Sequence, residues 1–210
     1  MRTLVPVAEA KRGSGRRRTS PSKGDLRELA ILDASERQLG EIGVQHMTVE
    51  TIATAAGITR GALYFYFSSK NDVLAALVQR TADGVAGAVG RAQAQAPDDP
   101  RQALQKAVLQ TAQMWQEHGP VMRVAVELGP VVPEIEASWQ AAVSAASSAT
   151  HQLLVEAGVP DDTSPLGAFA VSAALVSMTE RYFYAASKQG ASLTDAAQTL
   201  THVWHAVLPA

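Results

Sequence analysis

The sequence predicts an all-α protein in which an N-terminal three-helix head with a helix-turn-helix precedes a larger helical body, about nine helices in all. Apolar residues recur at helical spacing from residue 25 onward. Proline and glycine divide the later chain into segments of helical length, and no convincing strand pattern is present. These patterns indicate an arm at 1–22, a head at 23–70 and a body at 71–210, whose residues 71–95 form a connecting helix.

The composition excludes several kinds of protein. The 210 residues are 47% apolar and include no cysteine, which excludes a wholly disordered chain, disulfides, thiolate metal sites and cysteine nucleophiles. The N-terminal run LVPVA is too short for an export signal, and the later uncharged runs contain Ser, Thr, Gln and His. We therefore expect a soluble, intracellular protein with no membrane partner.

Positive charge is concentrated in the arm. Residues 1–80 hold 12 Lys or Arg and 8 Asp or Glu, whereas residues 81–210 hold 6 and 12, so the two parts carry +4 and −6. Arg16, Arg17 and Arg18 lie among Gly, Ser, Thr and Pro, a composition that cannot bury a core and should be disordered alone. These arginines could contact phosphates or a minor groove, or they could serve only solubility.

The first predicted helix covers about residues 25 to 39 and braces the two helices that follow it. Charged residues lie outside its apolar surface. Most of that surface is supplied by Leu26, Leu29, Ala30, Leu32, Ala34 and Leu39.

Residues 48–70, TVETIATAAGITRGALYFYFSSK, predict two short helices joined by a tight turn. The Thr48 hydroxyl can cap the first helix, which then turns Ile52 and Ala53 inward. Gly57 stands where that helix must stop, in a position that favours positive φ. Thr59 can cap the second helix, from about residue 60 to 66.

The outward face of this second helix can enter a DNA major groove. Two tyrosine hydroxyls and an ammonium at its far end are placed to bind phosphates rather than to read bases. The predicted DNA-contacting residues are Thr48, Thr59, Arg60, Gly61, Ala62, Tyr64, Tyr66 and Lys70, with Arg16, Arg17 and Arg18 of the arm. The alternative is a pair of packed surface helices whose aromatic residues belong to the core.

The connecting helix begins after Lys70 and ends at the PDDP sequence. It carries Gly84, Gly87 and Gly90 at three-residue intervals, and each glycine costs a helix about 1 kcal/mol relative to alanine. Our hypothesis is that they permit a bend. The alternative is that they only admit a neighbouring helix.

The body should form helices at 101–117, 121–128, 133–157, 164–188 and 193–208. Pro133 and Pro165 fit first turns, Gly158 and Gly190 fit helix ends, and Ser192 with Asp195 fits a capping box. The last two helices are rich in Ala, Ser and Leu, so they could pack against the same pair from a second subunit as a four-helix interface.

An enzymatic function finds little support. His202 and His205 share a helix face, but no third metal ligand lies at suitable spacing. Glu180 and Arg181 fit an internal ion pair better than an acid and a base. No Ser-His-Asp ordering, phosphate loop or nucleotide fingerprint is present, so we predict no catalytic residue, no metal and no cofactor.

The helix-turn-helix, its aromatic-rich end and the following Ser-Lys resemble the TetR family of regulators. A mycobacterial branch of that family is the closer match, through GDLRELAIL at 24–32, GITRGALYFYFSSK at 57–70, ER at 180–181 and HVW at 202–204. The resemblance implies a homodimer that binds a palindromic operator in bacterial cytoplasm, represses an oxidoreductase or monooxygenase gene and is released by an apolar small molecule.

The resemblance also implies a ligand pocket in the body. Trp139 and Trp204 match pocket-lining tryptophans, and Thr179 stands where the relative has a ligand-bonding asparagine. The predicted lining residues are Leu104, Thr111, Trp115, Met122, Trp139, Val143, Val176, Thr179, Phe183 and Trp204. The same side chains could equally form ordinary core.

Two other functions are consistent with the same predicted DNA-binding head. The first is a DNA-binding regulator that activates or needs no ligand. The second is a DNA-packaging protein without sequence preference, although such a protein would need no large apolar body.

Overall fold

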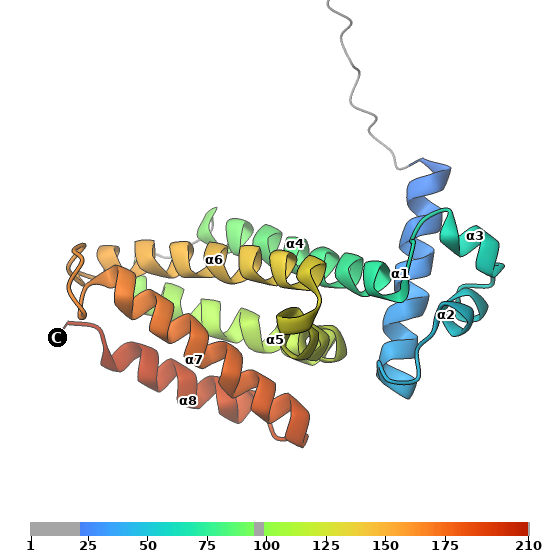
Figure 1. The fold of residues 1–210 in the computed structure, drawn as a ribbon. Coiled ribbons are helices and arrows are strands. Elements are labelled where there is room, and N and C mark those ends of the chain that lie inside the picture. The colour runs from blue at the N-terminus through green and yellow to red at the C-terminus, as the bar shows by residue number, and fades with distance from the viewer. Residues whose placement is uncertain (1–21, 95–98, 210) are drawn as a thin grey trace, which may run out of the picture.

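The structure is a computed structural model that describes residues 22–94 and 99–209, and within these ranges all regular structure is helical (Figure 1). The arm with Arg16, Arg17 and Arg18 lies outside the described residues. The elements are α1 (Lys23–Ile42), α2 (Val49–Ala55), α3 (Arg60–Tyr64), α4 (Lys70–Ala94), α5 (Pro100–Leu128), the short 3-10 helix η1 (Gly129–Val131), α6 (Pro133–Glu156), α7 (Ala168–Gln189) and α8 (Leu193–Ala206). The predicted fold class is confirmed.

The head is formed by α1, α2 and α3, and α4 extends from it into the body, where α5 to α8 pack together (Figure 1). A capping box of Ser22 and Asp25 starts α1. Ile31, Leu32 and Leu39 of this helix are buried. Leu26 and Leu29 remain 55% and 42% exposed, because the first turns of α1 extend past the helices that cover its later part.

The head and the adjoining part of the body share one hydrophobic core. Ile52, Leu63 and Phe67 from the head are buried together with α4 residues that include Leu74 and Leu77. Val121, Val124, Ala125 and Ile135 from α5 and α6 complete this core. The head is therefore packed directly on the body.

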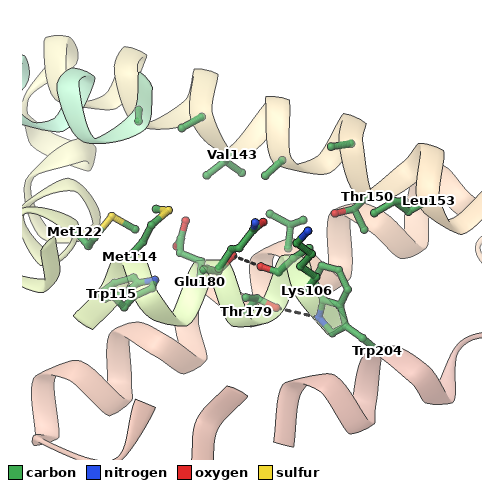
Figure 2. A pocket seen from close by; sticks show the side chains of 18 of the residues that line it. Lys106, Met114, Trp115, Met122, Val143, Thr150, Leu153, Thr179, Glu180 and Trp204 are labelled. Atoms are coloured by element: carbon green, nitrogen blue, oxygen red, sulfur yellow. Dashed lines mark hydrogen bonds between the residues drawn. The ribbon is translucent and has the colours of Figure 1, made fainter. Parts of the chain in front are cut away.

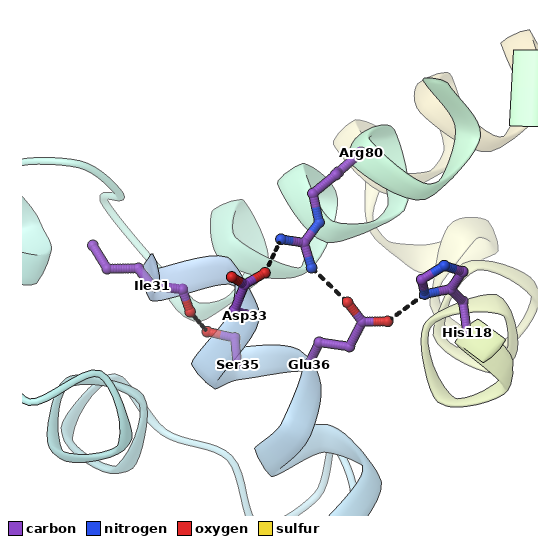
Figure 3. A network of polar contacts seen from close by, with 6 residues as sticks. All are labelled: Ile31, Asp33, Ser35, Glu36, Arg80 and His118. Atoms are coloured by element: carbon purple, nitrogen blue, oxygen red, sulfur yellow. Dashed lines mark hydrogen bonds and ion pairs between the residues drawn. The ribbon is translucent and has the colours of Figure 1, made fainter. Parts of the chain in front are cut away.

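A polar network also joins the head to the body (Figure 3). Arg80 of α4 donates to the Asp33 carboxylate at 2.6 Å and to the Glu36 carboxylate at 2.5 Å, and both acids belong to α1. The other Glu36 oxygen lies 2.6 Å from the Nδ1 of His118 in α5. We call these four residues the Glu36 network, and it connects three helices at the point where head and body meet.

The break predicted between helices at 101–117 and 121–128 is present, although the two segments form one element, α5, that is kinked at His118. Pro120 lies inside α5 and cannot donate a backbone hydrogen bond, while its ring conflicts with the preceding turn. The chain absorbs this conflict at His118, whose φ of −123° and ψ of 23° are not helical, and the helix then resumes.

The start of α7 also differs from the prediction. Pro165 does not occupy its first turn, because the helix begins at Ala168 and residues 161–166 form a loop. A Cβ at Gly167 would lie 2.4 Å from the Asp162 carbonyl oxygen, so this turn requires glycine. Pro133 begins α6 and Gly190 ends α7 with a φ of 67°, as predicted. Helix α1 is longer than the predicted 25–39, and α3 ends at Tyr64 rather than at 66.

Candidate functional site

The turn between α2 and α3 is built by local hydrogen bonds. The Thr48 hydroxyl accepts from the Thr51 amide at 3.1 Å, and the Thr51 hydroxyl accepts from the Thr48 amide at 2.9 Å. Gly57 has a φ of 64°, which L-residues rarely adopt, and the Thr59 hydroxyl accepts from the Ala62 amide at 3.1 Å. The two predicted caps and the predicted glycine turn are confirmed.

Helix α3 presents an exposed face that includes Thr59, Arg60, Gly61 and Ala62. Leu63 is fully buried beneath it and fixes the helix on the head core. A helix anchored on one side and polar on the other has the shape that a major groove accepts.

Arg60 and Tyr64 are coupled on this exposed face. The Arg60 guanidinium donates to the Tyr64 hydroxyl through Nη2 at 2.9 Å and lies 5.4 Å from the centre of the tyrosine ring. This hydrogen bond raises the pKa of Arg60 above its usual value. The arginine predicted to read bases and a tyrosine predicted to bind phosphate therefore hold each other in place.

The other predicted phosphate ligands lie beyond α3. The Lys70 ammonium donates to the Val44 carbonyl at 3.2 Å, which leaves two of its three hydrogens for another acceptor. Tyr66 is half-buried and packs against the head core. Phe65, between the two tyrosines, is 83% exposed and meets the Tyr66 ring edge-on.

An apolar cavity lies in the body among α4, α5, α6, α7 and α8 (Figure 2). It contains about 1180 Å³ of empty space, counted together with the part open to solvent. Its lining consists of Ala82, Ala103, Lys106, Ala107, Gln110, Thr111, Met114, Trp115, Met122, Trp139, Ala142, Val143, Ala146, Ala149, Thr150, Leu153, Val176, Thr179, Glu180 and Trp204. A concave apolar site with a few polar groups is typical of small-molecule binding.

All of the predicted pocket residues line this cavity except Leu104 and Phe183. Both exceptions are fully buried in the core on α5 and α7. The resemblance and the residue types on which these positions were predicted could not distinguish a side chain facing the cavity from one packed against the next helix.

Two tryptophans of the cavity wall are fixed by hydrogen bonds to α7. The Trp139 indole donates to the Glu180 carboxylate at 2.9 Å, and the Trp204 indole donates to the Thr179 hydroxyl at 3.0 Å. The predicted ion pair between Glu180 and Arg181 is wrong, because Arg181 lies over the ring of Tyr184 instead, 5.1 Å from its centre. Neighbouring helix residues point in different directions, so Glu180 faces inward and Arg181 outward.

Sequence reasoning found Thr111 and Thr179 but missed the other polar members of the lining, which are Lys106, Gln110, Thr150 and Glu180. Lys106 and Gln110 are one turn apart on the α5 face that also carries Met114. Their spacing to Met114 was the available signal, but charged and amide residues are usually assigned to solvent.

Helix α4 contacts both candidate sites. Ala82 lines the cavity, and Arg80, two residues earlier, holds the Glu36 network that joins α4 to α1. A displacement of α4 at the cavity would therefore also move Arg80, which lies within one helical turn and contacts α1 of the head.

The outer face of α7 leaves apolar and small side chains uncovered. Phe169 is 73% exposed, and Ala173, Ala174 and Ser177 follow it on the same face. Tyr182, further along, is 44% exposed. Large exposed aromatics beside small residues are typical of an interface that a single chain leaves open.

Among the described residues, no three His, Cys, Asp or Glu side chains are grouped so that they could hold a metal ion. The His205 Nε2 lies 3.0 Å from the Arg101 carbonyl oxygen, a backbone contact. No helix in the described part of the chain has the length and apolar character needed to cross a membrane.

Comparison with known proteins agrees with this geometry. Residues 31–77, which cover the later part of α1, α2, α3 and the start of α4, match the family described as bacterial regulatory proteins, tetR family. The chain is 30% identical over 207 residues to the HTH-type transcriptional regulator EthR of Mycolicibacterium smegmatis, and the match covers 96% of this chain and 94% of that protein.

Solved structures have the same fold. The transcriptional regulator FadR from Bacillus subtilis, in complex with stearoyl-CoA, aligns with a TM-score of 0.69 at 16% identity over 84% of this chain and 96% of that one. The SmeT–triclosan complex aligns with a TM-score of 0.68 at 22% identity over 86% and 90% of the two chains.

Proposed function

The chain belongs to the TetR family of bacterial DNA-binding transcriptional regulators, and we propose that it is a repressor that binds a palindromic operator as a homodimer and leaves it when an apolar small molecule enters the cavity. The observation that carries this proposal is the exposed face of α3 on a head that α4 connects to a body with an apolar cavity. The relatives are regulators rather than enzymes.

The groups on α3 divide into two roles. Thr59 and Arg60 lie at the N-terminal end of the helix, the part that meets base edges when such a helix enters the major groove. Tyr64 and Lys70 lie beyond it, where a hydroxyl and an ammonium can bind phosphates. Base reading by Thr59 and Arg60 gives sequence preference, whereas the phosphate ligands fix the position of the head on DNA.

A homodimer would supply the second reading helix. Two α3 helices about 34 Å apart would match successive major grooves on one side of a duplex, and this twofold arrangement is the reason for proposing a palindromic operator. We assign the interface to residues 164–188 and 193–208, because the exposed face of α7 carries Phe169 and small residues that admit close packing. Ala174→Arg should then produce monomers in sedimentation equilibrium, while Ala145→Arg on the exposed face of α6 should not.

Ligand release requires that the ligand favour one conformation of the dimer. A molecule in the cavity lowers operator affinity only to the extent that it binds a dimer with separated heads more tightly than the operator-fitting dimer. A coupling of about 1 to 3 kcal/mol would weaken operator binding by roughly 5 to 150-fold. The bound stearoyl-CoA and triclosan in two structural neighbours support a ligand in this fold.

Selection of binding sites from a random duplex library tests the proposal directly. Recovery of one inverted repeat at near-physiological salt is the expected result, and its position in the genome would test the proposed oxidoreductase or monooxygenase target. Binding to all duplexes alike, with affinity that falls as salt rises, would instead indicate a DNA-packaging protein. A promoter fusion would show whether occupancy represses or activates.

Variants of the head separate reading from positioning. Arg60→Ala should change which bases are recovered, whereas Lys70→Ala should weaken binding to every sequence and reduce its salt dependence. Tyr64→Phe should slightly change the recovered bases, because it releases the Arg60 guanidinium, and should slightly weaken binding to every sequence, because it removes a phosphate ligand.

A further inference from the structure

Two ionisable side chains line the otherwise apolar cavity, and they carry opposite charges. Lys106 projects from α5 and Glu180 from α7, and both are half-buried. Figure 2 shows both side chains directed toward the space between α5 and α6. A charge beside an apolar wall is costly unless an opposite charge or a hydrogen bond compensates it.

The Glu180 carboxylate has a partner within the protein. The Trp139 indole donates to its Oε2 at 2.9 Å. Lys106, by contrast, has no hydrogen bond or ion pair with any residue in the described part of the chain. Of the two charged groups that line the cavity, the one without a protein partner is therefore a cation, so an entering molecule gains most by bringing an anion to it.

A second donor stands beside Lys106. Gln110 lies one helical turn further along α5 and also lines the cavity. Its amide can donate to an oxygen that the Lys106 ammonium also holds. A carboxylate has two oxygens and can accept both contacts, whereas an alcohol offers only one weaker acceptor.

The remaining lining fits an apolar chain. Figure 2 places Met114 and Met122 toward one end of the cavity and Leu153 and Trp204 toward the other. Methionine side chains are flexible and adapt to chains of different shape. The Glu180 carboxylate between these ends would repel a second negative charge, which limits the molecule to one anionic group.

We propose that the cavity binds an amphipathic monocarboxylate, with its carboxylate held by Lys106 and Gln110 and its apolar chain against the methionine and tryptophan side chains. This inference rests on the proposed function, because it treats the cavity as the effector site. It adds the chemical class of the effector and the residue that recognises it.

The tryptophans provide a direct measurement. The three tryptophans of the chain, Trp115, Trp139 and Trp204, all line the cavity, so intrinsic fluorescence reports entry of a ligand without any DNA present. The probes are decanoate, decanol and decylamine, which share a chain length and differ in the charge of the head group. Each is titrated below its micelle concentration into the full chain.

Decanoate should bind at least about tenfold more tightly than decanol, because charge-assisted hydrogen bonds are roughly twice as strong as neutral ones. Lys106→Met keeps the unbranched shape of the side chain, without the ammonium group, and should abolish this preference. Lys23→Met makes the same change of charge on the exposed start of α1 and should leave the preference intact.

Three results would overturn the inference: equal affinities for decanoate and decanol, tighter binding of decylamine, or no fluorescence change with any probe. A preference for decanoate that survives Lys106→Met would also refute the assigned residue. Because these titrations contain no DNA, their outcome is independent of whether an operator exists. Decanoate that binds through Lys106 without weakening operator binding would leave the ligand class standing and remove ligand release from the proposed function.

Discussion

Thr179→Val should destabilise the protein through a single hydrogen bond at the cavity wall. The Thr179 hydroxyl accepts the Trp204 indole N–H at 3.0 Å, and the two residues are only 6% and 4% exposed. Valine has nearly the shape of threonine, so packing is preserved while the acceptor is removed. The variant therefore leaves a buried indole donor without a partner.

The expected cost follows from that burial. An unsatisfied buried donor costs about 1 to 3 kcal/mol, and the lower value applies if water from the cavity reaches the indole. For a chain of this length each kcal/mol lowers Tm by about 2 to 4 °C, so we expect a decrease of roughly 2 to 12 °C.

Urea denaturation followed by far-ultraviolet circular dichroism is the suitable assay, because tryptophan fluorescence would respond to the substitution itself. Protein concentration must be held constant, since the apparent stability of the proposed dimer would depend on it. Thr199→Val on the exposed side of α8 is the matched control, because its hydroxyl bonds only the Asp195 carbonyl one turn earlier. Its stability should stay within about 0.5 kcal/mol of the parent.

A second variant checks the cause. Thr179→Val combined with Trp204→Phe removes donor and acceptor together, so it should be less destabilised than the sum of the single changes. If Thr179→Val unfolds at the same urea concentration as Thr199→Val, or if the double variant is simply additive, the hydrogen bond is not what holds Trp204 in place.

Three further predictions concern the head, the connecting helix and their junction. Gly57→Ala should destabilise the protein by about 1 kcal/mol, because the backbone φ of 64° at this position is unfavourable for alanine. Gly84→Ala should stabilise α4 by about 1 kcal/mol, because the added Cβ meets no atom within 4 Å; urea denaturation that shows the two variants shifted in the same direction would contradict this pair of predictions. Glu36→Gln should cost about 1 kcal/mol in the same assay, since it removes the charge at the centre of a half-buried network, and unchanged stability would make that network incidental. The Ser68 hydroxyl lowers the pKa of Asp72, so the ionised carboxylate contributes stability that is present above its unfolded pKa and is lost as pH falls through the lower folded pKa. Between about pH 6 and pH 3, Asp72→Asn should therefore lose less thermal stability than the parent. An equal loss of thermal stability in both proteins would contradict this assignment.

The sequence was most informative where structure is local. Thr48, Gly57 and Thr59 act through hydrogen bonds and backbone angles within four residues, so their roles could be derived without the tertiary fold. The all-helical class followed in the same way from periodicity and from proline and glycine positions.

Prediction was weaker where a residue's role depends on a distant neighbour. Glu180 lies beside Arg181 in sequence, but its partner Trp139 is 41 residues away on α6. Lys106 could be placed on a helix but not at a cavity, because the cavity exists only where five helices meet.

The geometry of α4 limits how a ligand could affect DNA binding. The head is held by an apolar core and by Arg80, while Ala82 in the next half turn borders the cavity. A ligand that merely fills existing space binds every conformation of the protein alike and changes no affinity for DNA, however tightly it binds. A ligand that moves α4 must strain the Glu36 network or carry α1 with it, since Asp33 and Glu36 both belong to that helix. For the proposed monocarboxylate, chain length should therefore matter more for release than for binding, because the carboxylate would provide the affinity and the bulk of the chain near Ala82 would decide whether α4 shifts.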